Sequence, residues 1–176
     1  MANALDSKFR RLLHNPNKIL KPFIRKNMTV LDVGCGPGVF SVEIAKLMEG
    51  TGKIISADMQ EGMLEIIRNK IRGTPFENRF VLHKCQPDRV GVSEKLDFVL
   101  MFYMVHEVPD RNSLFAEILP LINRDGLLMI AEPSLVSKKA FSAMINSVKE
   151  YGFSEECGIK ISFGRGIVLK RTEVTE

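Results

Sequence analysis

The sequence predicts an α/β fold: a Rossmann-like, doubly wound, mostly parallel seven-stranded sheet with helices on both faces and a C-terminal antiparallel hairpin. Short apolar runs rich in β-branched residues alternate with segments whose apolar residues recur at helical spacing. Glycines and prolines fall between these segments. The chain has 176 residues, of which 45% are hydrophobic, so we expect residues 1–176 to form one domain.

The first half of the chain carries two strand and helix pairs and then a third strand. Gly50 and Gly73 end the two helices. Before the first strand, we expect residues 1–27 to form helices that cover the substrate side of the sheet. The predicted strands are residues 28–33, 53–57 and 79–83, and the predicted helices are residues 39–48 and 63–71.

The second half begins with the more continuously apolar run 96–102, which predicts a central strand buried on both faces. Asp110 is placed to cap a helix that runs to about residue 119. The remaining elements are a buried strand at 126–131, a helix at 137–150, and strands at 158–163 and 167–170 around a glycine turn at 164–166. Because no helix separates the last two strands, they predict an antiparallel hairpin.

Ligands of parallel α/β sheets bind beyond the carboxyl ends of the strands, where the glycines Gly34, Gly36 and Gly38 follow the first strand. Glycines allow positive φ and let a ligand approach the backbone, and the next helix offers its free amides. Glycines alone would also fit a plain tight turn. The end of the next strand adds Asp58, whose carboxylate can accept two hydrogen bonds from a ribose diol. The glycine turn and Asp58 together predict an adenosine-containing ligand.

The glycine spacing disfavours a dinucleotide. Counting G-x-G-x-x-G from Gly34 places Val39 at the third glycine, and counting from Gly36 places Ser41 there. The predicted C-terminal hairpin also adds an antiparallel edge that a dinucleotide-binding sheet lacks.

These residues resemble the Rossmann-like, class I S-adenosylmethionine-dependent methyltransferases, from about residue 15 to residue 170. Residues 30–40 look like the first motif of that family, with Asp32 as its acid, and residues 119–128 look like the turn before its fifth strand. The resemblance implies S-adenosylmethionine as cofactor and S-adenosylhomocysteine as product. The residues it implies for cofactor binding are Asp32, Gly34, Cys35, Gly36, Gly38, Asp58, Met59, Cys85, Gln86 and Phe102.

The sequence departs from the family pattern at two places. Where many members have an adenine-binding aspartate after the third strand, this chain has Cys85 followed by Gln86. The Asn/Asp-Pro-Pro-Tyr motif of enzymes that methylate nucleic-acid amino groups is absent after the fourth strand. The segment 106–110, His-Glu-Val-Pro-Asp, is instead similar to small-molecule methyltransferases of the quinone-biosynthesis type.

Methyl transfer from a sulfonium is an in-line displacement, so catalysis consists mostly of positioning and, for some acceptors, removal of a proton. We expect His106 to be the general base, because histidine titrates near neutral pH and this one follows the fourth strand. Tyr103 is expected to orient the acceptor or to close over the sulfonium. The alternatives are that His106 caps or packs the following segment, that Tyr103 is a core residue, and that Glu132 caps residues 134–137.

Composition excludes several classes. No apolar run is long enough for a membrane span, the amino terminus lacks signal-peptide features, and the three cysteines are widely spaced, so we expect a cytoplasmic protein with free thiols. The three histidines fall in different elements, and no metal site is expected. The sequence sets no oligomeric state.

Three functions remain open: a methyltransferase for a small-molecule acceptor, an RNA methyltransferase, and a noncatalytic S-adenosylmethionine-binding module. The RNA hypothesis comes from basic residues near the start, although such charges also fit the solvated face of amphipathic helices. Those residues are Lys8, Arg10, Arg11, Lys18, Lys21, Arg25 and Lys26. The sequence does not fix whether the methyl acceptor atom is O, N, C, S or As.

Overall fold

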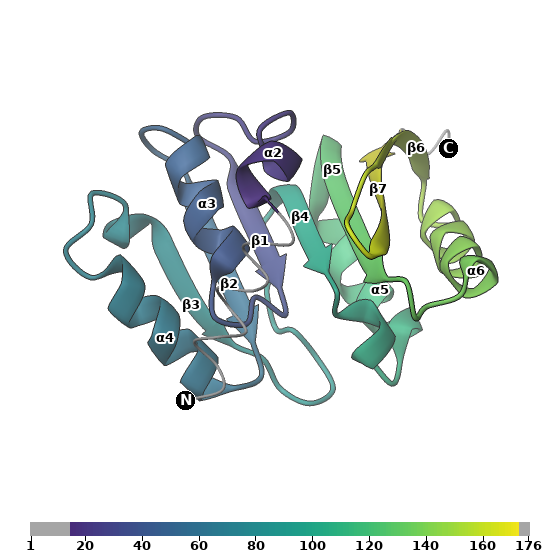
Figure 1. Ribbon diagram of the computed structural model, residues 1–176, viewed down its shortest axis with the longest axis horizontal. Coiled ribbons are helices and arrows are strands. Elements are labelled where there is room, and N and C mark those ends of the chain that lie inside the picture. Colours follow the sequence, from purple (N-terminus) through teal and green to yellow (C-terminus); the bar gives the residue numbers. More distant parts are fainter. Residues whose placement is uncertain (1–14, 173–176) are drawn as a thin grey trace.

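The computed structural model describes residues 15–172, which form a seven-stranded sheet between two layers of helices (Figure 1). The strand order is β3-β2-β1-β4-β5-β7-β6, with only the β5–β7 and β7–β6 pairs antiparallel. The strands are β1 (Thr29–Val33), β2 (Lys53–Asp58), β3 (Phe80–Lys84), β4 (Leu96–Phe102), β5 (Ile122–Pro133), β6 (Phe153–Ile159) and β7 (Gly164–Arg171). The helices are α2 (Pro16–Leu20), α3 (Val39–Leu47), α4 (Glu61–Ile71), α5 (Arg111–Ile118) and α6 (Lys138–Lys149). The predicted fold class is confirmed.

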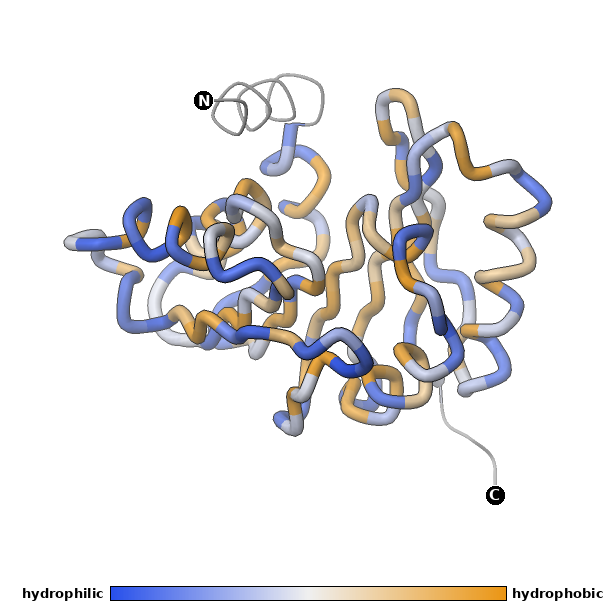
Figure 2. Tube along the Cα trace, turned by 90° about the horizontal axis from the view of Figure 1, so that it is seen from below, coloured by the Kyte–Doolittle hydropathy of each residue, from blue (hydrophilic) through white to orange (hydrophobic). Residues whose placement is uncertain are grey.

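Helices cover both faces of the sheet, because alternate residues of each strand face opposite layers. In β1, Val30 packs with Ile44 of α3, whereas Leu31 packs in the core that includes Phe115 of α5 and Ile145 of α6. Helices α2, α3 and α4 lie over one face, and α5 and α6 lie over the other (Figure 1). Hydrophobic residues accordingly concentrate along the strands in the middle of the molecule (Figure 2).

Strand β4 lies in the middle of the sheet, between β1 and β5. Phe98 and Leu100 are buried toward α3, and Val99 and Met101 are buried toward α5 and α6. This explains the continuous apolar run that predicted a central strand. Asp110 caps α5 as expected, since its side chain accepts a hydrogen bond from the backbone N–H of Ser113.

The C-terminal hairpin is present, but the predicted turn at residues 164–166 is wrong. The turn lies at residues 160–163, and Gly164 and Gly166 belong to β7. Gly164 lies against the neighbouring strand: a Cβ there would be 2.7 Å from the carbonyl oxygen of Glu132 and 2.4 Å from the hydroxyl of Tyr103. Gly164 therefore allows close packing inside the sheet. Sequence spacing alone does not distinguish a glycine needed for close packing from a glycine needed for a turn.

The described part of the N-terminal segment packs on α3. Leu20 of α2 is fully buried in the same core as Ile44 and Met48. None of residues 15–27 lines the cavity at the carboxyl ends of the parallel strands. The rest of the predicted N-terminal cover, with the basic residues Lys8, Arg10 and Arg11, falls outside the described residues.

Residues 15–172 contain neither a membrane-spanning helix nor a cluster of metal-binding side chains. No helix in that range combines the length and apolar character needed to cross a membrane. Within the same range, no three histidine, cysteine, aspartate or glutamate side chains gather as a metal site would require.

Replacing Gly164 with Ala is expected to destabilise the protein by about 1–3 kcal/mol, because the new methyl group meets a strand backbone that cannot move aside. For a chain of this length that corresponds to a fall in Tm of roughly 2–4 °C per kcal/mol, measurable by thermal unfolding. Gly158→Ala in β6 is the matched control, since a Cβ at Gly158 meets nothing within 4 Å. Equal melting temperatures for the two variants would contradict this account of β7.

Candidate cofactor and acceptor site

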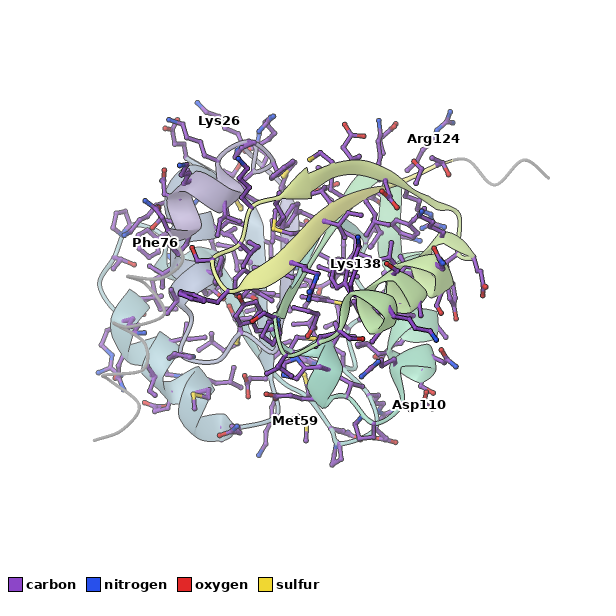
Figure 3. The ribbon with its side chains drawn as sticks, turned by 45° about the vertical axis from the view of Figure 1, so that its right-hand side comes forward. Lys26, Met59, Phe76, Asp110, Arg124 and Lys138 are labelled. Carbon is purple, nitrogen blue, oxygen red and sulfur yellow. The ribbon has the colours of Figure 1, made fainter. Side chains whose placement is uncertain are left out.

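A cavity of about 670 Å³ opens at the carboxyl ends of β1, β2, β3 and β4. Its volume falls within the range of about 300–1,000 Å³ typical of small-molecule sites. The lining residues Met59 and Asp110 lie at one end of the molecule, and Lys26 lies at the other (Figure 3). The cavity is therefore where the alternation of strands and helices predicted a ligand site.

The glycine turn after β1 forms one wall. Gly34, Gly36 and Gly38 have φ values of 65°, 51° and 75°, in the left-handed region that glycine adopts without strain. A Cβ on Gly34 would lie 2.9 Å from Cβ of Met104, so the glycine lets the turn pack against the segment after β4. A Cβ on Gly36 would meet nothing within 4 Å, which leaves its backbone open to a ligand.

Asp58 at the end of β2 holds this turn in place. One carboxylate oxygen accepts the backbone N–H of Gly36 at 2.8 Å, and the other accepts that of Gln60 at 2.8 Å. Each oxygen keeps a second lone pair, and the side chain lines the cavity. Asp58 can therefore bind two hydroxyl groups while it fixes the loops on both sides.

A second acid lies buried beneath the turn. Asp32 is 3% exposed and accepts a hydrogen bond of 2.5 Å from the hydroxyl of Ser41, which in turn accepts one from Ser56. Burial raises the pKa of Asp32 to about 7, the negative charge of Asp58 adds to the rise, and the bond from Ser41 opposes it. Asp32 supports the turn from below and is not among the residues that line the cavity.

The far wall comes from the segment after β4. Phe102 and Tyr103 stack with ring centroids 4.6 Å apart, and the hydroxyl of Tyr103 donates to the carbonyl oxygen of Ser162 in the β6–β7 turn. Met104 and Glu107 also line the cavity. This wall meets the glycine turn where Met104 approaches Gly34.

Glu132 at the end of β5 anchors that wall. It is 1% exposed; one oxygen accepts the backbone N–H of Val105 at 2.9 Å, and the other lies 2.5 Å from Nδ1 of His106. Burial raises the pKa of Glu132, and the adjacent imidazole opposes that rise. The expectation that Glu132 caps residues 134–137 is wrong, because both of its oxygens are directed at the segment after β4.

The structure gathers most of the predicted site residues. Gly34, Gly36, Asp58, Met59, Cys85, Gln86, Phe102 and Tyr103 line the cavity. Gly38 caps α3 and packs against Ile67, Cys35 is buried behind the turn, and His106 lies behind Glu107 with Nε2 3.8 Å from that carboxylate. Burial also raises the pKa of the Cys85 thiol to about 11.

The sequence did not predict the part of the cavity wall that comes from α5 and from the segments before β4 and before α5. The additional lining residues there are Arg89, Val108, Pro109, Ser113, Leu114 and Glu117. The order of elements did contain a signal, since a helix that follows β4 must begin at the carboxyl edge of the sheet. Glu117 accepts the backbone N–H groups of Val90 and Gly91, a contact between residues too distant in sequence to infer.

The residues present fit S-adenosylmethionine. Asp58 would hold the ribose diol, Met59 and Met63 would contact the adenine, and the turn at Gly34 and Gly36 would lie along the rest of the cofactor. Cys85 and Gln86 occupy the edge where the adenine amino group would lie.

Comparison with known proteins shows the family. The methyltransferase domain family matches residues 24–172, and this chain belongs to that family. A structure of an S-adenosylmethionine-dependent methyltransferase from Aquifex aeolicus is 20% identical, with a TM-score of 0.80 over 93% of each chain. The match confirms the family that the glycine turn and Asp58 indicated.

Curated relatives carry different acceptors in their names. A demethylmenaquinone methyltransferase of Staphylococcus aureus is 26% identical over 69% of this chain and 49% of its own. A ribosomal protein L11 methyltransferase of Dictyoglomus turgidum is 26% identical over 77% of this chain and 42% of its own. The chain thus spans about half the length of the curated relatives it matches.

Replacing Asp32 with Asn is expected to remove a pH dependence of stability. With a pKa of about 7 when folded and 3.8 as the ordinary value, the carboxyl binds more protons in the folded chain between about pH 4 and pH 7. Its contribution is complete below about pH 4 and is lost as the pH rises through about 7, by up to roughly 1.4 kcal/mol per pH unit.

Urea unfolding of the cofactor-free protein across this range measures the effect. As the pH rises from about 4 to 7, the free energy of unfolding of the natural protein should fall relative to that of Asp32→Asn. The exposed control Asp88→Asn should show the same fall as the natural protein. Parallel curves for all three proteins would show that Asp32 is ionised throughout.

Proposed function

We propose that this chain transfers a methyl group from S-adenosylmethionine to a small-molecule acceptor. The observation that carries the proposal is one continuous cavity with two kinds of wall: the glycine turn with Asp58 on one side, and the segment after β4 with α5 on the other. The first wall suits the nucleoside, and the second leaves space for an acceptor. The quinone-directed names among the relatives support a small molecule.

The charge of the cavity supports a small acceptor over RNA. Its acidic lining residues are Asp58, Asp88, Glu107, Asp110 and Glu117, against the one basic lining residue Arg89 among the described residues. Such a lining repels phosphates, which dominate nucleic-acid binding. Of the basic residues near the start, Lys26 lies at the opposite end of the molecule (Figure 3).

The bound cofactor supplies a methyl carbon that its sulfonium has already activated. The chain's own residues then position the acceptor and, where the acceptor carries a proton, accept it. We assign the proton to Nε2 of His106, which is not itself a lining residue but lies 3.8 Å from the carboxylate of the lining residue Glu107. Glu132 holds the other ring nitrogen and fixes the ring. Tyr103, fixed by its bond to Ser162, orients the acceptor against the glycine turn.

The substrate-side cover predicted for residues 1–27 is not part of this proposal, because residues 15–27 are absent from the cavity lining and residues 1–14 fall outside the described residues. The protein acts in the cytoplasm, for which the support is the free thiols of Cys35, Cys85 and Cys157.

Asp58→Asn is expected to weaken S-adenosylmethionine binding about 10- to 100-fold in calorimetric titration, because one acceptor of the charge-assisted bonds to the ribose becomes a donor. Asp88→Asn is the matched control, since it removes an acid from the same lining without touching the Gly36 and Gln60 amides. Unchanged affinity in Asp58→Asn, or tighter binding of NAD than of S-adenosylmethionine, would contradict the nucleoside assignment.

His106→Asn is expected to lower kcat about 100-fold or more for an acceptor that loses a proton, with cofactor affinity unchanged. The amide of asparagine reaches roughly the position of Nδ1 and keeps a donor for Glu132, so the fold is retained. A variant that keeps its full turnover would show that His106 only supports the wall.

A further inference from the structure

Two large apolar side chains stand out from the surface near the cavity. Leu135 is 76% exposed and Phe163 is 74% exposed, the highest values among the large hydrophobic residues that the structure describes. Leu135 lies between β5 and α6, and Phe163 lies in the β6–β7 turn. Both loops are at the end of the sheet where the parallel strands finish (Figure 1). We call this pair the apolar lip.

The two loops of the lip are joined to each other and to the cavity. The backbone N–H of Ser134 donates to the carbonyl oxygen of Phe163 at 2.9 Å, and Arg165 donates to the carbonyl oxygen of Val136 at 2.6 Å. Ser162 accepts the hydroxyl of Tyr103, a residue of the cavity wall. The lip is therefore a braced ledge beside the acceptor side of the cavity.

The backbone at Phe163 carries a local cost. Its φ is 56°, in the left-handed region where a bulky aromatic residue is an outlier and glycine is not. Packing does not explain the choice, because the side chain is mostly exposed. Such costs concentrate at sites that contact a ligand or partner.

The two segments that carry the lip contain basic residues and no acidic ones. Residues 133–140 and 160–166 have no aspartate or glutamate. The adjoining Glu132 is buried and bound by His106, and the exposed Glu107 and Asp110 belong to the cavity lining. The basic residues of the two segments are Lys138, Lys139, Lys160 and Arg165.

We propose that the apolar lip docks on the surface of an anionic lipid bilayer. Leu135 and Phe163 would enter the interface, and the four basic residues would face the lipid head groups, an arrangement typical of interfacial anchors. Two side chains are far too few for a stable protein interface, which buries about 1,200–2,000 Å². An exposed leucine and phenylalanine also form no hydrogen bond or ion pair with a nucleic-acid phosphate.

The hydroxyl of Tyr103 joins the lip to the cavity wall through its bond to Ser162. The inference goes beyond the proposed function and does not depend on it, since lipid binding requires neither cofactor nor turnover.

Co-sedimentation of the full chain with lipid vesicles tests the proposal. We expect binding to vesicles of phosphatidylcholine mixed with phosphatidylglycerol, weaker binding to phosphatidylcholine alone, and loss of the difference at high salt. Equal binding to both compositions, or no binding to either, would overturn it.

Phe163→Gly separates docking from a structural role. Glycine accepts the backbone conformation at Phe163, so the melting temperature should stay the same or rise while vesicle binding weakens about tenfold. Leu135→Ser should act similarly on binding. Val81→Ser, which removes an exposed apolar residue from β3, is the matched control and should leave binding unchanged.

The charge component is tested by Lys138→Ala, Lys139→Ala and Lys160→Ala, each expected to weaken binding to anionic vesicles about fivefold. Lys18→Ala combined with Lys21→Ala on the opposite side is the control. Binding that depends on Lys18 and Lys21 and survives the changes at the lip would place the lipid contact in the N-terminal segment and refute the proposal.

Discussion

The geometry of the site depends on buried carboxylates that tie the end of one strand to the backbone of the next turn. Asp58 does this for the wall that contains the glycine turn, through the amides of Gly36 and Gln60. Glu132 does the same for the wall after β4, through Val105 and His106. Since a buried carboxylate without such partners is strongly destabilising, each clamp fixes its loop as firmly as the core fixes the strands.

Much of this organisation could be predicted from the sequence, because it follows from local patterns. Strand β4 is apolar on both faces, and the glycines of the turn have the positive φ that their spacing indicated. The family was indicated by that turn together with Asp58. These features depend on neighbouring residues, or on the rule that parallel strands end at one edge.

The remainder depends on contacts between distant segments, which no local pattern records. Glu132 and His106 are 26 residues apart, and their pairing follows from the register of β4 and β5. The hairpin turn was misplaced because glycine fits either a bend or a tight contact, and only the position of Glu132 beside Gly164 decides between them. The wall from α5 was missed because helical periodicity reports the buried face and says nothing about the end of a helix.

Left-handed backbone is distributed unevenly between the two ends of the sheet. At the amino end it occurs at the polar residues Asn27, Glu49 and Asp125. Asn27 and Glu49 lie in loops and Asp125 lies at the irregular start of β5. Asparagine and aspartate tolerate this conformation. At the carboxyl end the non-glycine positions are Tyr103 and Phe163, whose aromatic side chains gain nothing from the conformation. Tyr103 recovers part of the cost through its bond to Ser162, one residue before Phe163. A fold optimised for stability alone would place glycine or asparagine at both positions, so this rim is shaped by what it contacts.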